Sequence, residues 1–96
     1  MLQQLTITTT DRTMLRPLVE SALENEKKML ALGIERTRKR LAEFEQEFGM
    51  SSAEFERRLN ALELIETVEF TDWRMEVGML HLLESRYKAL REARLD

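Results

Sequence analysis

The sequence predicts a mainly α-helical protein: a short N-terminal β-strand, a long amphipathic helix, a short capped helix and a C-terminal helix. Three observations predict this class. Apolar residues recur at steps of three and four up to residue 48 and again after residue 71. A glycine followed by two serines interrupts them once, at residues 49–52. Three Gly and one Pro in 96 residues are too few for the turns of an all-β fold.

Composition limits the class of protein further. Ninety-six residues make one domain, spanning 1–96. A charged fraction of 34% and a hydrophobic fraction of 43% fit neither a disordered tail nor a membrane protein. The absence of Cys excludes disulfides, thiolate metal sites and Cys nucleophiles. A net charge of -3 gives no general attraction to nucleic acid or anionic membranes, so we expect a soluble cytoplasmic protein without membrane association.

The first twelve residues, 1–12, are expected to form a strand or arm. Over residues 3–10, Leu5 and Ile7 alternate with polar residues, and β-branched side chains dominate, which is typical of a strand. This strand has no second strand in the chain with which to pair. It would need a copy of itself or a partner protein to satisfy its backbone groups.

A long helix is expected over residues 13–48. Asp11 or Thr13 is its candidate N-cap, and Pro17 marks an early turn. A second apolar row widens the stripe in the first half, at Leu15, Leu18, Ala22 and Met29. The main seam, with steps of three and four, contains Val19, Leu23, Glu26, Leu30, Ile34, Thr37, Leu41, Phe44 and Phe48.

The boundary after this helix is strongly marked. Gly49 follows the last seam residue, where a left-handed C′ glycine is usual, and Met50 is expected to pack back on the helix. Ser51 and Glu54 have the spacing of a capping box. The sequence therefore predicts that a short helix, residues 51–62, begins at once.

The last third of the chain contains a connection and a helix. Residues 63–71 mix β-favouring residues with glutamates, which predicts an irregular connection or a frayed helical segment. Thr71 is the candidate N-cap of a C-terminal helix over residues 71–95. Its seam contains Trp73, Val77, Leu80, Leu83, Tyr87 and Leu90, flanked by Met75, Met79 and Leu82.

A single hairpin of such helices would leave much of both apolar stripes in water. A chain of this size rarely buries enough surface for a robust fold by itself. We therefore expect a homodimer, in which the hairpins form a bundle and two N-terminal strands pair across the two-fold axis. Trp73 would either anchor a partner or be buried inside the bundle. The candidate dimer or partner interface consists of Leu5, Ile7, Leu23, Leu30, Ile34, Leu41, Phe44, Trp73, Leu80, Leu83 and Tyr87.

Few residues suggest chemistry. His81 and Glu84 stand at i,i+3, as in carboxylate-bridged di-metal bundles, but the facing seam offers only Glu26 as a further carboxylate. No Gly-rich phosphate loop and no Ser/His/Asp spacing occur. The basic run over residues 36–40 fits either an acidic or phosphate-bearing partner or a solvated helix face. We expect no enzymatic activity, no metal and no cofactor.

One segment resembles a known family. Residues 48–55 read FGMSSAEF, and acidic residues and then Trp73 follow after a short gap. Across residues 44–73 this is similar to small prokaryotic antitoxin-like proteins of toxin–antitoxin gene pairs, of the type in which TumA accompanies the toxin TumE. The resemblance implies a non-enzymatic protein that binds and neutralises a small toxin-like partner protein, and it implies no catalytic residues.

Three functions remain open from the sequence. The first is an antitoxin-like homodimer that binds and silences a partner protein, whose basic surface the acidic C-terminal half could cover. The second is a ribbon-helix-helix repressor, in which Gln4, Thr6 and Thr8 read bases while Arg12 and Arg16 hold phosphates. The third is a structural component of a phage or appendage assembly.

Overall fold

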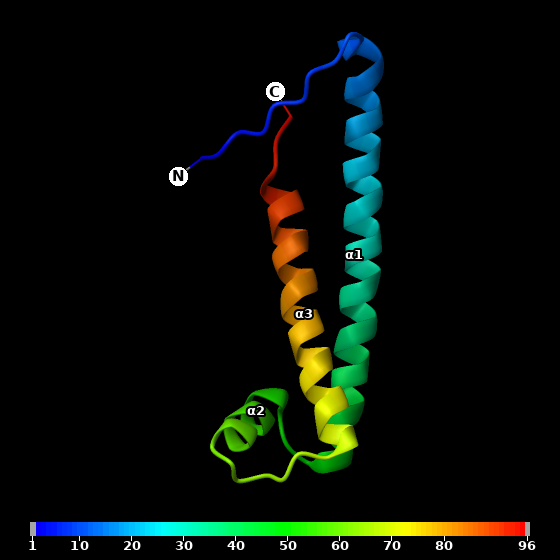
Figure 1. The fold of residues 1–96 in the computed structure, drawn as a ribbon. Coiled ribbons are helices and arrows are strands. Elements are labelled where there is room, and N and C mark those ends of the chain that lie inside the picture. The colour runs from blue at the N-terminus through cyan, green and yellow to red at the C-terminus, as the bar shows by residue number, and fades with distance from the viewer. Residues whose placement is uncertain (1, 96) are drawn as a thin grey trace.

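The computed structural model describes residues 2–95 and contains three helices (Figure 1): α1 (Arg12–Phe48), α2 (Ser52–Asn60) and α3 (Val68–Glu92). Helices α1 and α3 run antiparallel and pack on each other, and the short α2 lies at the closed end of this hairpin. The molecule measures 58 × 26 × 18 Å. Its radius of gyration is 18.8 Å, against about 12.5 Å for a compact domain of this length. The fold is therefore an extended helical hairpin.

Both ends of α1 are capped by the residues that the sequence indicates. The Asp11 carboxylate accepts a hydrogen bond from the Met14 backbone N–H at 3.0 Å, so Asp11 rather than Thr13 is the N-cap. The helix starts at Arg12, one residue before the predicted start. At the other end Gly49 adopts the left-handed conformation, with φ of 67°, and its N–H donates to the Glu45 carbonyl. The predicted glycine stop is confirmed.

Helix α2 begins as predicted but ends at Asn60, two residues before the predicted end. The Ser51 hydroxyl accepts from the Glu54 backbone N–H at 3.1 Å, which confirms the serine half of the capping box. The Glu54 carboxylate binds the guanidinium groups of Arg57 and Arg58, each at 2.8 Å.

The prediction for the start of α3 was wrong by three residues. Thr67, not Thr71, is the N-cap, and its hydroxyl accepts from the Phe70 backbone N–H at 3.1 Å. Thr71 lies inside the first turn, where its hydroxyl donates to the Glu66 carboxylate. Both threonines suit a cap, but the earlier start lets Phe70 pack against the aromatic residues of α1 and α2. The helix ends at Glu92, before the predicted residue 95.

The predicted N-terminal strand is not present in residues 2–10. A strand needs a neighbouring backbone with which to pair, and no segment of residues 2–95 forms a strand. Leu5 is fully exposed and Ile7 is 61% exposed. β-favouring composition alone could not make a strand here, and the segment is an extended arm that leads to the Asp11 cap.

The core lies at the closed end and is aromatic. Trp73 and Phe55 have no exposed surface, and their rings stack at 4.0 Å with an angle of 1° between the planes. The Trp73 indole N–H donates to the Ser52 hydroxyl at 2.9 Å, so its one polar atom is satisfied. Leu41, Phe44 and Val77 complete the buried cluster. All four Phe residues of the chain, 44, 48, 55 and 70, contact one another or the single Trp.

Candidate interaction surfaces

The structure separates the predicted interface residues into three groups. Leu30, Leu41, Phe44 and Trp73 are buried within the hairpin, so no partner can contact them without unfolding it. Leu5 and Ile7 are exposed on the N-terminal arm. The other residues are half-buried along the contact of α1 and α3: Leu23, Ile34, Leu80, Leu83 and Tyr87. Most of the predicted interface is therefore the chain's own core.

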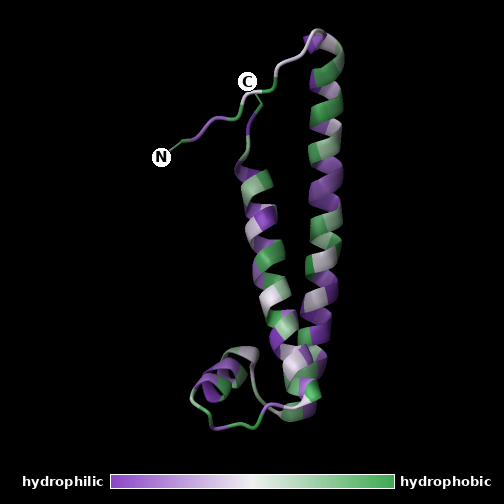
Figure 2. Cartoon of the chain, in the orientation of Figure 1, coloured by the Kyte–Doolittle hydropathy of each residue, from purple (hydrophilic) through white to green (hydrophobic). Residues whose placement is uncertain are grey.

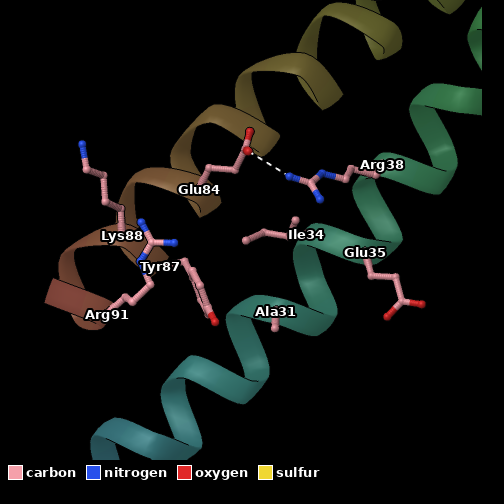
Figure 3. A pocket seen from close by; sticks show the side chains of 8 residues that line it. All are labelled: Ala31, Ile34, Glu35, Arg38, Glu84, Tyr87, Lys88 and Arg91. Carbon is pink, nitrogen blue, oxygen red and sulfur yellow. Dashed lines mark hydrogen bonds and ion pairs between the residues drawn. The ribbon is translucent and has the colours of Figure 1, made fainter.

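One side of the hairpin is charged. The Arg38 guanidinium binds the Glu84 carboxylate at 3.1 Å across α1 and α3 (Figure 3). This ion pair lies beside an open groove of about 560 Å³, which Ala31, Ile34 and Tyr87 line with apolar or aromatic surface. Lys88 and Arg91 of α3 stand at its rim (Figure 3). Cations and anions alternate on this side, so its net charge is small.

The His81 and Glu84 pair does not form the metal site that its spacing allows. Glu84 binds Arg38 instead, and His81 is exposed. Glu26, the only other carboxylate of the seam, is also exposed. Within residues 2–95, no three His, Asp or Glu side chains lie together as metal ligands would.

The opposite side of the hairpin is apolar. Each residue of an α-helix turns by about 100°, so Leu18, Ala22 and Met29 project to the same side of α1 as Gly33. A Cβ atom on Gly33 would lie 3.3 Å from the Leu83 side chain, so Gly33 and Leu83 mark where the two helices meet on this side. Met79 of α3 projects to the Leu83 side. We call the exposed apolar residues here the lateral stripe: Leu18, Ala22, Met29, Leu32, Met75, Met79 and Leu82.

The lateral stripe runs diagonally. On α1 it occupies residues 18–32, near the open end, where Figure 2 shows hydrophobic bands alternating with hydrophilic ones. On α3 it occupies residues 75–82, nearer the closed end. The part of the stripe on α1 extends the second apolar row that the sequence predicts beside the main seam. That row consists of Leu15, Leu18, Ala22 and Met29. The hairpin itself does not cover it.

A second apolar surface lies at the closed end, on the segment between α2 and α3 and on the first residue of α3. Leu62 is 88% exposed, Ile65 87% and Val68 79%. Leu62 has a positive φ of 60°, which a residue with a branched side chain rarely adopts. Its N–H donates to the Leu59 carbonyl at 3.1 Å, and the Glu63 N–H donates to the Arg58 carbonyl at 2.9 Å. This is the Schellman pattern, with Leu62 where glycine is usual.

Two ion pairs hold this loop in place. Arg57 of α2 binds Glu63 at 3.2 Å, and Arg74 of α3 binds Glu66 at 2.6 Å. The loop is therefore tied to the helix before it and to the helix after it. We call residues 61–69, which include the first two residues of α3, the closed-end loop. Its Leu62 and Ile65 side chains are exposed to solvent. Its backbone is fixed by hydrogen bonds and ion pairs to the helices before and after it.

Charge is divided unequally along the hairpin. The closed end, residues 42–76, carries ten acidic and three basic side chains, a net charge of -7. The rest of the described chain, residues 2–41 and 77–95, carries seven acidic and twelve basic side chains, a net charge of +5. Glu69 and Asp72 are exposed, and no ion pair engages them among the described residues. The elongated molecule therefore has an acidic closed end.

The electrostatics of α2 are dominated by Glu54. Hydrogen bonds from Arg57 and Arg58 stabilise its charged form and lower the pKa of its carboxyl from 4.5 to about 2. The same contact raises the pKa of Arg57 above its ordinary value. One residue of the basic run of α1 has contacts within the chain. The Arg40 guanidinium binds the Glu43 carboxylate at 3.4 Å and lies 4.5 Å from the centre of the Phe44 ring.

Sequence reasoning missed the closed-end loop as a surface. A signal was present, because an apolar residue directly precedes a glutamate at positions 62–63, 65–66 and 68–69. This spacing of three fits neither an amphipathic helix nor an alternating strand, so the pattern predicts only a connection.

Comparisons with known proteins leave the fold and its surfaces as the guide to function. No protein-family model, no curated protein and no solved structure matches the chain. In the part of the chain that the structure describes, neither α1 nor α3 has a stretch apolar and long enough to cross a bilayer.

Proposed function

We propose that this chain is a non-enzymatic interaction protein that binds a basic partner protein through its closed-end loop and silences it, as an antitoxin does. The observation that carries the proposal is the exposure of Leu62, Ile65 and Val68 on a held loop at an end with a net charge of -7. The family resemblance over residues 44–73 covers this same end of the molecule.

The chemistry of the loop supports a protein partner with a basic surface. Apolar side chains that stand in water are costly for a free protein and supply affinity when a partner covers them. Carboxylates around such residues speed encounter with a cationic surface and discriminate against acidic ones. The exposed Glu69 and Asp72 are suited to this second role.

The backbone of Leu62 adds an independent argument. A left-handed residue with a Cβ costs about 1 kcal/mol or more, and glycine would remove that cost. Strain of this kind is commonly retained where a side chain has a function. An exposed leucine, with no packing role of its own, fits that description.

Two observations speak against the ribbon-helix-helix alternative. Residues 2–10 form no strand, and α1 continues without a break for 37 residues where that fold needs two short helices. The assembly-component alternative differs from our proposal only in the identity of the partner, so the same experiment separates them.

The test is co-purification of the tagged chain from cells that carry its gene, with mass spectrometry of the bound protein. We expect one small basic protein in near-stoichiometric amount that arrests growth when expressed alone. Co-expression of the present chain should restore growth. Recovery of the chain with an assembly protein that is harmless alone would contradict the antitoxin function.

Leu62→Gly is the decisive variant. It removes the side chain and relieves the backbone strain, so the variant should be folded at least as well as the parent while losing rescue of growth. Ile7→Ser is the control, since it removes an exposed apolar side chain from the arm; Ile7 is 61% exposed, against 88% for Leu62. Full rescue by Leu62→Gly, or loss of rescue with Ile7→Ser, would overturn the assignment to the loop.

A further inference from the structure

We infer that a second copy of the chain covers the lateral stripe, in antiparallel orientation, so that residues 18–32 of α1 pack on residues 75–82 of α3 of the partner subunit. This interface is distinct from the closed-end loop. The inference rests on the area of exposed surface, on the spacing of the stripe and on the distribution of charge.

The first argument is area. A folded monomer of 11.4 kDa ordinarily exposes about 5,800 Å². This chain exposes 8055 Å², an excess of about 2,300 Å² over that expectation. A standard protein interface buries about 800 Å² per partner, and permanent dimers bury more. The excess is sufficient for a stable dimer, and the exposed apolar side chains of the lateral stripe are part of it.

The second argument is the spacing of the stripe on α1. Residues 15, 18, 22, 25, 29 and 32 alternate steps of three and four, which is the heptad spacing of a helix that packs against another helix. Leu15, Leu18, Ala22, Met29 and Leu32 occupy five of these positions, and Asn25 occupies the sixth. Met75, Met79 and Leu82 continue the same spacing on α3.

The third argument concerns orientation. A parallel dimer would bring two closed ends together, each with a net charge of -7. An antiparallel dimer instead places each acidic closed end toward the basic remainder of the other chain. Charge of this kind selects orientation and partner.

The diagonal course of the stripe fits the same arrangement. Its α1 half lies toward the open end and its α3 half toward the closed end. Reversing one copy therefore brings an α1 half onto an α3 half at both ends of the contact. The Gly33 and Leu83 crossing lies between the two halves, close to where the two-fold axis would pass.

The experiment is disulfide mapping, which the chain permits because it has no cysteine. Ala22→Cys and Met79→Cys chains, mixed under mild oxidation, should give mainly the mixed disulfide dimer. Lys88→Cys, exposed at the rim of the charged groove, should give at least tenfold less cross-linking. Dominant Ala22→Cys homodimers would overturn the antiparallel orientation.

Sedimentation equilibrium of the unmodified chain tests the dimer itself. We expect a mass of twice 11.4 kDa, and Leu18→Glu with Met79→Glu should weaken association by ~100-fold because both carboxylates would be buried without partners. Leu62→Glu, on the closed-end loop, should leave association unchanged. A monomer at millimolar concentration would refute the inference while leaving the proposed function standing, since growth rescue is measured separately.

Discussion

Phe55→Ala tests whether one ring docks α2 on the hairpin. Phe55 has no exposed surface and stacks on Trp73 at 4.0 Å, with Phe70 at 5.3 Å on its edge. Truncation of a buried Phe to Ala costs about 3–5 kcal/mol. A nine-residue helix is too short to persist without packing, so α2 should unfold locally when this contact is lost.

The assay is urea unfolding followed by fluorescence and far-ultraviolet circular dichroism at one fixed protein concentration, because association would otherwise shift the apparent stability. Trp73 is the only Trp, so its emission should move to longer wavelength in the variant before any urea is added. Glu56→Ala, also on α2, is the control and should change the free energy of unfolding by less than about 0.5 kcal/mol. A loss below about 1 kcal/mol for Phe55→Ala, with unchanged emission, would refute the docking argument.

Three further predictions concern backbone and charge. Gly49→Ala places a Cβ at a φ of 67° and should lower the free energy of unfolding by about 1 kcal/mol, whereas Gly78→Ala, in an open helical position, should raise it by up to about 1 kcal/mol. Thermal unfolding of both variants checks the opposite signs. The lowered pKa of Glu54 contributes stability that is present above pH 4.5 and is lost as the pH falls toward about 2. Glu54→Gln should therefore reduce the dependence of helicity on pH within that window, and an unchanged pH profile would contradict the Arg57 and Arg58 contacts.

The helices were predictable because their ends carry local chemical signals. Gly49 and Ser51 each act within one turn of the backbone, so neighbours in sequence decide their conformation. The apolar seam likewise predicted the α1 side of the core, except that Glu26 is exposed. Periodicity could not reveal that the core would be concentrated at one end of the hairpin. The position of the core depends on the contacts between four Phe and one Trp, which are up to 29 positions apart in the sequence.

The errors arose where the outcome depends on distant contacts. The β-branched residues 3–10 favour a strand, yet a strand exists only when another backbone pairs with it. Thr67 and Thr71 are equivalent as caps, and the packing of Phe70 favours the first. Most residues of the predicted interface lie inside the hairpin, because the same apolar periodicity describes the inside of a hairpin and the contact between two hairpins. Leu41 and Phe44 belong to the first, and we propose that the exposed Leu18 belongs to the second.

The two proposed surfaces differ in what holds them in place. The closed-end loop is supported by the aromatic cluster and by the Arg57 and Arg74 ion pairs, all within one chain. Along α1 toward the open end, no residue before Leu30 is buried, so that half of the hairpin has little core of its own. A second copy on the lateral stripe would supply that core. Amide hydrogen exchange should therefore be slow near Trp73 at any protein concentration, whereas over residues 15–29 it should slow as concentration rises. Protection of the open half that does not change with concentration would mean that the single hairpin stabilises itself.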